Sequence, residues 1–397
     1  MRDVPAEFAQ ALRELGLAAT DEPLVGEPLT GGVSSDIWRI ETRGGPVCAK
    51  RALARLRVAA DWRAPIERNL YEARWMRVAH AAVPGSVPRV RGQHAALGVL
   101  VMDYLPPGGH ALWKEQLRRG VAEPATAAAV GRTLVRIHAY SAARAAELGP
   151  QFDTDRIFFD IRLEPYLVAT AARHPDLAAA LHALVAQTQH AKSALVHGDV
   201  SPKNILVPLG VTVEATKEAK SASAAGVRAA ADGAAVEPDL AAPPVLLDAE
   251  CAWWGDPAFD LAFCLNHLLL KALWVPEAQP ALAACFGALV AAYRAGIDWE
   301  DPAALERRAA ALLPGLLLAR VDGKSPVEYL DRPEQHGAVR RAARRLLLQP
   351  VPMLAEVSAI WQREVAAMPP RDVPGDAPAS ATGDTHGNAP GRPRSGA

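Results

Sequence analysis

A polar loop between two apolar runs carries the residues best suited to chemistry. The segment 195–207 reads LVHGDVSPKNILV, and its polar centre contains Asp199 and Asn204. A segment that packs at both ends and is polar in the middle is typical of a loop held on a rigid base, where catalytic groups often lie. Asp199 and Asn204 are therefore the first candidate site residues.

A second short apolar run, Val245–Leu247, ends directly in a carboxylate, Asp248, and Glu250 follows two residues later. A carboxylate at the end of a buried strand can hold a hard cation against nucleotide phosphates. Asp248 and Glu250 are therefore candidate metal ligands, and they follow the polar loop in the same half of the chain.

Together the two motifs resemble the aminoglycoside phosphotransferase and choline kinase-like family, whose catalytic loop carries HGD in place of the protein-kinase HRD. The resemblance is carried by His197-Gly198-Asp199, Asn204, Asp248-Ala249-Glu250 and Gly255-Asp256-Pro257. The Asp-to-Asn spacing, D-x-x-x-x-N, is that of the kinase catalytic loop. The resemblance implies an α+β, two-lobed, protein-kinase-like fold with a small antiparallel-sheet N-lobe and a larger, mostly helical C-lobe.

The resemblance also implies a role for each of these residues. Asp199 would accept or orient the proton of the acceptor hydroxyl, and Asn204 and Asp248 would hold Mg²⁺. Glu250 would contact a second ion or a water molecule. Asp260, ahead of an apolar helix, resembles the residue that braces the catalytic loop by hydrogen bonds.

The N-terminal third reads as strands around a Gly/Ser-rich turn. Strands are expected at Leu24–Thr30 and Ile37–Glu41, and the residues between them include Gly31, Gly32, Ser34 and Ser35. Such a turn lets the backbone and hydroxyls approach phosphate oxygens. The alternative is an ordinary hairpin turn, because a bare Gly-Gly is a weak motif.

Lys50 ends the next expected strand, Val47–Lys50, at the place where kinases hold the lysine that pairs with nucleotide phosphates. The alternative is a solvated lysine at a strand end. A helix is expected over Arg63–Ala81, and its Glu72 would orient Lys50, with Glu67 as the second choice. Either glutamate would otherwise form a surface pair with an arginine on the same helix.

The strand Leu97–Leu105 is followed by Pro106-Pro107-Gly108-Gly109, which indicates a boundary between lobes. In kinases this hinge binds the adenine edge through backbone groups, so residues from Asp103 to Leu105 are the candidate contacts. The expected organisation is an N-lobe at 1–105, a C-lobe at 106–368 with a low-complexity insertion at 209–244, and a disordered tail at 369–397.

Beyond the hinge the pattern is mostly helical. Helices are expected at Ala111–Gly120, Pro124–Leu148, Leu177–Lys192, Leu268–Gly296, Pro302–Val321, Arg340–Leu347 and Leu354–Met368. The aromatic segment Phe152–Tyr166 has two possible interpretations: it lines an acceptor pocket, or it packs its aromatic rings inward.

Composition limits the partners. Lys and Arg together number 43 and Asp and Glu 44, so bulk charge favours neither nucleic acid nor an anionic membrane as a partner. The four cysteines show no metal-ligand spacing and no disulfide framework, which is typical of reduced thiols in a cytoplasmic protein. The N-terminus lacks the apolar run of a signal peptide, and the apolar segment Leu261–Val275 is too short and too polar to span a bilayer. The sequence leaves the oligomeric state open.

The expected activity is ATP-dependent, with Mg²⁺, and moves the γ-phosphate to a hydroxyl of a small molecule such as an amino sugar, sugar or amino alcohol. The segment Trp62-Arg63-Ala64-Pro65, the Asp-x-Glu pair and the helical stretch after the hinge are similar to the methylthioribose kinase branch, which favours a sugar or polyol acceptor. Two alternatives remain. A protein kinase is disfavoured by the glycine after His197 and by the short distance between Asp248 and Gly255. An inactive nucleotide-binding scaffold is disfavoured because the lysine and the catalytic-loop residues are all present.

Overall fold

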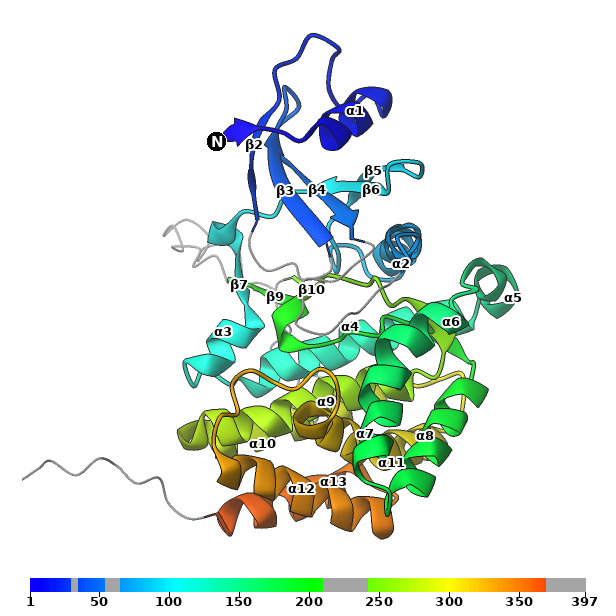
Figure 1. Cartoon of the computed structure of the whole chain (residues 1–397), viewed down its shortest axis with the longest axis vertical. Coiled ribbons are helices and arrows are strands. Elements are labelled where there is room, and N and C mark those ends of the chain that lie inside the picture. The colour runs from blue at the N-terminus through cyan, green and yellow to red at the C-terminus, as the bar shows by residue number, and fades with distance from the viewer. Residues whose placement is uncertain (30–34, 54–64, 210–241, 369–397) are drawn as a thin grey trace, which may run out of the picture.

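The structure of the protein is a computed structural model, and it describes residues 1–29, 35–53, 65–209 and 242–368. The predictions on Gly31, Gly32 and Ser34, on nearly all of the 209–244 insertion and on the 369–397 tail lie outside the described residues. Figure 1 shows a sheet with two helices at one end of the molecule and a larger helical part at the other.

The smaller lobe is built on a six-stranded antiparallel sheet of order β1-β2-β3-β4-β6-β5. Its strands are β1 (Arg2–Asp3), β2 (Val25–Pro28), β3 (Ser35–Glu41), β4 (Val47–Ala52), β5 (Val90–His94) and β6 (Val99–Asp103). Lys50 lies on β4 between Ile37 of β3 and Leu100 of β6. A lysine in the middle of a paired strand has a fixed backbone, which is what a positioning residue needs.

Two helices pack on this sheet, and they differ in what they bury. The helix α1 (Ala6–Glu14) buries Phe8, Ala11 and Leu12 at helical spacing. The helix α2 (Arg68–Ala82) instead buries Arg68, Asn69 and Glu72 beside its apolar residues. Buried polar groups need partners, so we expect these side chains of α2 to form hydrogen bonds or ion pairs inside the protein.

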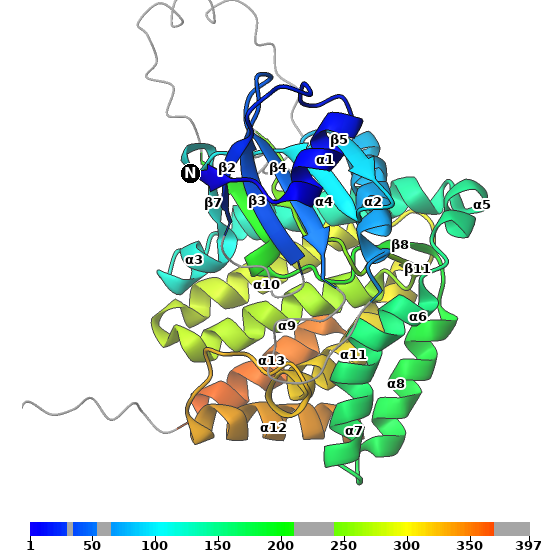
Figure 2. The same cartoon turned by 45° about the horizontal axis from the view of Figure 1, so that its top comes forward.

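The larger lobe is helical. Its helices are α3 (Trp113–Arg118), α4 (Pro124–Ala142), α5 (Ala145–Leu148), α6 (Asp155–Phe158), a π-helix at Phe159–Val168, α7 (Ala169–Arg173), α8 (Ala178–His190), α9 (Ala258–Trp274), α10 (Gln279–Arg294), α11 (Pro302–Asp322), α12 (Pro333–Leu348) and α13 (Leu354–Ala366). Every residue of α9 from Ala258 to Leu273 is buried, and most of them are apolar, as expected of a helix that lies inside a domain. Figure 2 shows α9 among the other helices of this lobe.

Three expectations about the helices were wrong. The helix expected over Pro124–Leu148 is interrupted, because α4 ends at Ala142 and α5 begins at Ala145. The single helix expected over Leu268–Gly296 is broken: α9 ends at Trp274 and α10 begins at Gln279, with Pro276 between them. Proline lacks an amide hydrogen and its ring clashes with the preceding turn, so it ends a helix. The helix expected from Ala111 begins only at Trp113, because residues His110–Leu112 form the strand β7.

Two small antiparallel sheets hold the segments that carry the candidate site. One has the order β10-β9-β7, with β9 at Ile205–Pro208 and β10 at Val245–Leu246. In the other, β8 (Ala194–Val196) pairs with β11 (Trp253–Gly255). The loop after β8 and the loop after β10 are therefore both anchored at each end, because β9 pairs with β10 and β8 pairs with β11.

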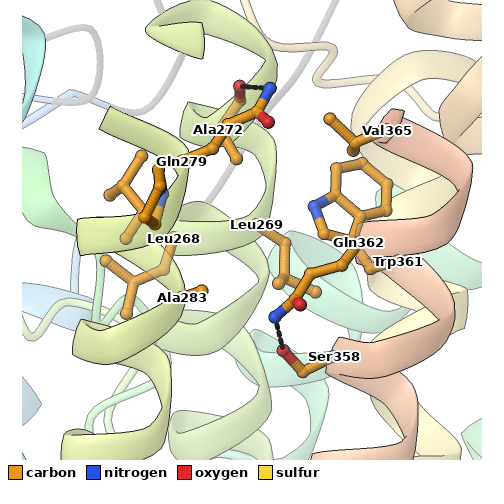
Figure 3. A pocket seen from close by; sticks show the side chains of 11 residues that line it. Leu268, Leu269, Ala272, Gln279, Ala283, Ser358, Trp361, Gln362 and Val365 are labelled. Carbon is orange, nitrogen blue, oxygen red and sulfur yellow. Dashed lines mark hydrogen bonds between the residues drawn. The ribbon is translucent and has the colours of Figure 1, made fainter. Parts of the chain in front are cut away.

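The predicted fold class is confirmed: the chain is α+β, with an antiparallel-sheet lobe and a mostly helical lobe. Among the described residues, no helix combines the length and the apolar character needed to cross a bilayer. An apolar pocket lies between α9, α10 and α13, and its lining includes Leu269, Trp361 and Val365 (Figure 3). None of the predicted site residues lines this pocket.

Candidate active site

Lys50 connects the two lobes through its ammonium group. Its Nζ lies 2.8 Å from Oε2 of Glu72 and donates a 3.0 Å hydrogen bond to Oε1. The same Nζ also donates to Oδ1 of Asp248, which is 198 residues further along the chain. Lys50 is only 3% exposed, and the structure places Glu72 of α2 against it, not Glu67.

The charges of this trio depend on each other. Burial raises the pKa of Glu72 to about 7, although Lys50 opposes the shift. Burial would also raise the pKa of Asp248, but Lys50 and Lys203 hold it well below its usual value. The pKa of Lys50 is raised, because Asp248 and Glu72 together outweigh the effect of its burial. The stable pair is therefore Lys50 with Asp248, and Glu72 holds its proton more readily than an ordinary glutamate.

The loop after β8 is fixed from below by Asp260 of α9. Its carboxylate accepts hydrogen bonds from the backbone amides of His197 (2.7 Å) and Gly198 (2.8 Å). Gly198 has φ +81°, and a Cβ at this position would lie 2.7 Å from Cβ of Cys251. The loop therefore requires glycine here both for its conformation and for space, and the prediction that Asp260 braces the loop is confirmed.

His197 acts as an internal support of the same loop. Its Nε2 lies 3.1 Å from the carbonyl oxygen of Leu247, and its Nδ1 accepts a 3.1 Å hydrogen bond from the amide of Asp199. Its ring also meets Trp75 edge to face, with centroids 4.7 Å apart. Burial lowers the pKa of His197, so the ring is neutral and joins the Asp199 loop to the Asp248 loop.

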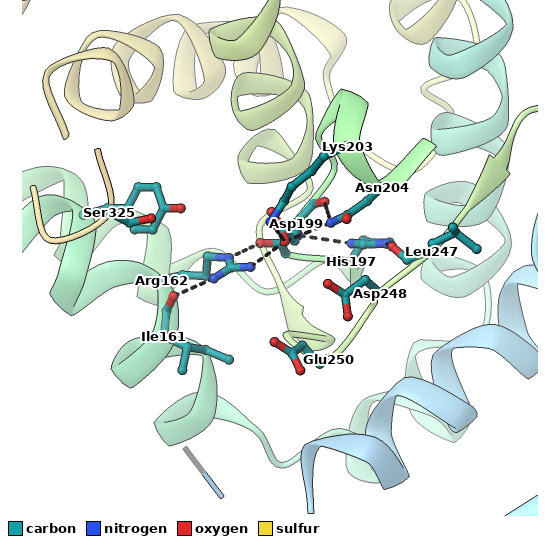
Figure 4. Close-up of polar contacts among 12 residues, drawn as sticks. Ile161, Arg162, His197, Asp199, Lys203, Asn204, Leu247, Asp248, Glu250 and Ser325 are labelled. Atoms are coloured by element: carbon teal, nitrogen blue, oxygen red, sulfur yellow. Dashed lines mark hydrogen bonds and ion pairs between the residues drawn. The ribbon is translucent and has the colours of Figure 1, made fainter. Parts of the chain in front are cut away.

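Asp199 is held by three donors on one carboxylate oxygen (Figure 4). Its Oδ2 lies 2.9 Å from Nδ2 of Asn204, 3.1 Å from Nη2 of Arg162 and 3.3 Å from Nζ of Lys203. None of these three contacts uses Oδ1. A carboxylate fixed through one oxygen presents the other in a defined direction, which suits it to accept a hydrogen bond from a hydroxyl.

Arg162 was missed by the reasoning from sequence. It lies in the π-helix within the aromatic segment, is buried, and also donates to the carbonyl oxygens of Ile161 and Gly198. A signal was present, because an arginine between Ile161 and Leu163 in an apolar stretch needs an acceptor if that stretch is buried. Which acceptor it meets, 37 residues later, is not readable from local spacing.

The predicted metal ligands are partly suited to Mg²⁺. The side chain of Asp248 is 28% exposed. The backbone of this residue has φ +67°, a conformation that aspartate tolerates better than most residues. The side-chain nitrogen of Asn204, Nδ2, donates to both the backbone oxygen and Oδ2 of Asp199. The side-chain oxygen of Asn204, Oδ1, is therefore left for another partner. Mg²⁺ is commonly held by one or two protein oxygens together with substrate phosphates, and this donor set fits that pattern.

Glu250 has a different environment from Asp248. Its Oε2 lies 3.0 Å from Nε of Arg68, which is fully buried at the start of α2. Figure 4 shows the carboxylates of Glu250 and Asp248 on the same side of the loop that carries Asp199. Across the described residues, no cluster of three or more His, Cys, Asp or Glu side chains is arranged to hold a metal ion. A direct metal contact by Glu250 remains a prediction.

The predicted nucleotide contacts of the smaller lobe are placed only in part. Ser35 begins β3, is buried, and its Oγ has no hydrogen-bond partner. The amide of Asp103 donates to the carbonyl oxygen of Arg89 (2.9 Å), and its carboxylate pairs with Arg91. Leu105 follows the end of β6 and is half-buried.

Comparison with known protein families gives one match, which covers part of the chain. Residues 25–213 match the model of the family described as "Phosphotransferase enzyme family". No curated protein matches the chain. The match agrees with the resemblance drawn from the HGD motif: residues 25–213 are similar to a family of phosphotransferases. The likeness to methylthioribose kinases stays a prediction.

Solved structures of such enzymes are similar to the chain. A macrolide 2'-phosphotransferase from Brachybacterium faecium is 18% identical over 86% of this chain and 99% of that one, with a TM-score of 0.45. An aminoglycoside phosphotransferase in a ternary complex with streptomycin and ATP is 13% identical over 90% and 99% of the two chains, with a TM-score of 0.43. The ethanolamine kinase of Plasmodium vivax is 10% identical over 86% and 81%, with a TM-score of 0.42.

Proposed function

We propose that this protein transfers the γ-phosphate of ATP, with Mg²⁺, to a hydroxyl of a small molecule. The observation that carries the proposal is the double contact of Lys50, whose ammonium meets Glu72 in one lobe and Asp248 in the other. Through His197 and the backbone of Leu247, the Asp248 loop is joined to the loop of Asp199. A lysine, a carboxylate for a cation and an oriented carboxylate are the groups that phosphoryl transfer requires.

In this proposal Asp199 orients the acceptor hydroxyl and receives its proton. Arg162, Lys203 and Asn204 hold Oδ2 of Asp199 in place. Its main contribution is therefore to position the hydroxyl, in agreement with a reaction that depends mostly on positioning and charge stabilisation. Lys50 binds the phosphates as a compact charge.

Asp248 and Asn204 would hold Mg²⁺, with Glu250 close by. When bound, this ion would neutralise the charge of the nucleotide phosphates. Asn204 has a second task that needs no metal, because its amide nitrogen fixes Asp199. One side chain thus joins the proposed metal position to the proposed acceptor position.

The test is the variant Asp199→Asn, which keeps the size of the side chain and removes its charge. Transfer of phosphate from ATP should fall by at least a hundredfold, because both the orientation and the proton acceptor are lost. ADP binding, measured by calorimetry, should stay within about threefold of that of the unaltered protein. Near-normal transfer in Asp199→Asn would show that the base is assigned to the wrong residue.

The acceptor class is tested separately, by measuring ATP consumption with amino sugars, sugars and amino alcohols in the absence of any protein acceptor. Turnover stimulated by a small alcohol supports the proposal. Phosphate incorporation only into added protein supports a protein kinase, and ADP binding without any turnover supports an inactive scaffold.

A further inference from the structure

A row of cationic side chains extends from Asp199 toward the end of α9. It consists of Arg162, Lys203, Arg320 and Lys271, with the ring of His267 beside them on α9, and we call these four cations the cationic row. The ring of Tyr166 links its first part: the guanidinium carbon of Arg162 lies 5.9 Å from the ring centroid and that of Arg320 lies 5.5 Å from it. Arg320 also donates a 3.0 Å hydrogen bond to the Tyr166 hydroxyl.

Helix α9 carries the other part of the row. The ring of Phe263 lies 5.8 Å from the Arg162 guanidinium carbon, and His267 meets Phe263 edge to face at 5.3 Å. Lys271 follows one turn later, with Nζ 4.5 Å from the ring of Tyr329. Because Asp260 on the same helix binds the catalytic loop, the helical rise puts His267 about 10 Å and Lys271 about 16 Å along the axis from that loop.

Two members of the row lack the counterion that a buried cation needs. Arg320 is 8% exposed and Lys271 is 1% exposed, and within the described parts of the chain no carboxylate lies at ion-pair distance from either. The carboxylate on the adjoining loop, Glu328, is mostly exposed and is bound to Lys114 at 2.5 Å. Arg320 donates to Tyr166 and Ser325 through Nη1, but a buried charge without a counterion is costly, so this part of the row is suited to an anion.

Unmet hydrogen-bond donors occur at the same place. Nε of Arg320 has no hydrogen-bond partner, and neither has the hydroxyl of Tyr329. Burial, with the neighbouring Lys114, lowers the pKa of Lys271 to about 7. Burial with Arg320 and Lys271 holds the pKa of His267 well below its usual value. A bound carboxylate or phosphate would pair with Arg320 and would favour the charged forms of Lys271 and His267.

We infer that the acceptor is an anionic alcohol whose carboxylate or phosphate group binds Arg320 and Lys271 while its hydroxyl meets Asp199. This inference rests on the proposed function and narrows it. An alcohol carrying ammonium groups would be repelled by the cationic row, so amino sugars and amino alcohols are poor acceptors. The anionic group would bind near the level of His267.

The test compares four sugars that share a skeleton: glucose, glucosamine, gluconate and glucose 6-phosphate. The full chain is saturated with ADP and Mg²⁺, and its melting temperature is measured with each sugar at constant ionic strength. Gluconate or glucose 6-phosphate should raise the melting temperature, because a ligand that binds only the folded state stabilises it. Glucose and glucosamine should leave it unchanged. Comparing the two anions separates a carboxylate site from a phosphate site.

Variants then assign the effect to its residues. Arg320→Gln and Lys271→Met should each remove the stabilisation by the anion, whereas Arg320→Lys should keep part of it and thereby show that the site still folds. The control is Arg341→Gln, which removes a cation from an exposed pair with Glu364 and should change nothing. In phosphate-transfer assays, Arg320→Gln should raise the KM of the anionic sugar about tenfold and alter kcat much less.

The outcomes separate this inference from the function on which it rests. If neither anion stabilises the protein more than glucose does, or if both variants keep the effect, the anion site is wrong. If glucose or glucosamine is phosphorylated better than the anions and Asp199→Asn abolishes that transfer, the function stands and the anionic acceptor is wrong. If an anion binds through Arg320 and no alcohol is phosphorylated, the anion site stands and the kinase function is wrong.

Discussion

Glu72→Gln tests the charge state of the trio around Lys50. A buried carboxylate, that of Glu72, and a half-buried one, that of Asp248, contact one ammonium group. With both ionised, the group would carry a net negative charge away from water, and burial raises the pKa of Glu72 to about 7 from an ordinary value of 4.5. Glutamine resembles the protonated form of Glu72 in shape and charge.

The raised pKa determines the sign of the effect. Between about pH 4.5 and pH 7 the folded protein holds a proton on Glu72 that the unfolded chain has released. Folding therefore binds protons in this window, and the contribution of Glu72 to the free energy of unfolding falls as pH rises. A difference of about 2.5 pKa units, at about 1.4 kcal/mol per unit, gives an upper value of about 3 kcal/mol.

The assay is urea denaturation of both proteins at pH 5, 6, 7 and 8. The free energy of unfolding of Glu72→Gln, taken relative to that of the unaltered protein, should rise by up to about 3 kcal/mol between pH 5 and pH 8. The reason is that the unaltered protein loses stability as Glu72 releases its proton, and glutamine has no proton to release. Glu356→Gln, on an exposed face of α13, is the control and should show no such trend. A constant difference for Glu72→Gln, or one that falls with pH, would refute the shared-ammonium model.

Three further variants test the supports of the catalytic loop. Arg162→Met removes a donor to Asp199 and should lower kcat at least tenfold, or about 1.4 kcal/mol, with little change in ADP affinity; an unchanged kcat would contradict the positioning role. Gly198→Ala should cost about 1–3 kcal/mol of stability and more than Gly16→Ala, because both glycines have positive φ but only position 198 would clash with Cys251. Equal costs in the two variants would exclude the clash. Asp260→Asn places an amide donor opposite backbone amides and should cost about 2 kcal/mol, measured by urea denaturation; a stability equal to that of the unaltered protein would show that the brace is dispensable.

Local patterns were sufficient for the elements and for the loops that carry the site. The apolar runs around Asp199 and before Asp248 became short paired strands, β8, β9 and β10, because an apolar run beside a polar turn packs in only a few ways. Lys50 lies on the expected strand for the same reason. Pro276 marks the break between α9 and α10, but the long apolar pattern on both sides of it predicts a single helix.

Partners that lie far apart in sequence were harder to predict. Arg162 meets Asp199, and Arg68 meets Glu250 across 182 residues. The residues around each arginine do not predict its partner, because both contacts arise from the packing of separate helices and loops. The strand β7 was hidden for a similar reason: residues His110–Leu112 are extended because β9 pairs with them, and no local pattern marks them as a strand.

The contacts of Lys50 have a mechanical consequence. One ammonium group connects a helix of the sheet lobe to a loop of the helical lobe; Lys50 and Glu72 are buried, and Asp248 is half-buried. Rotation of one lobe away from the other would break the contact between Lys50 and Asp248, so this ion pair helps to hold the lobes together. Phosphate groups that reach this lysine would compete with Asp248 for its ammonium group.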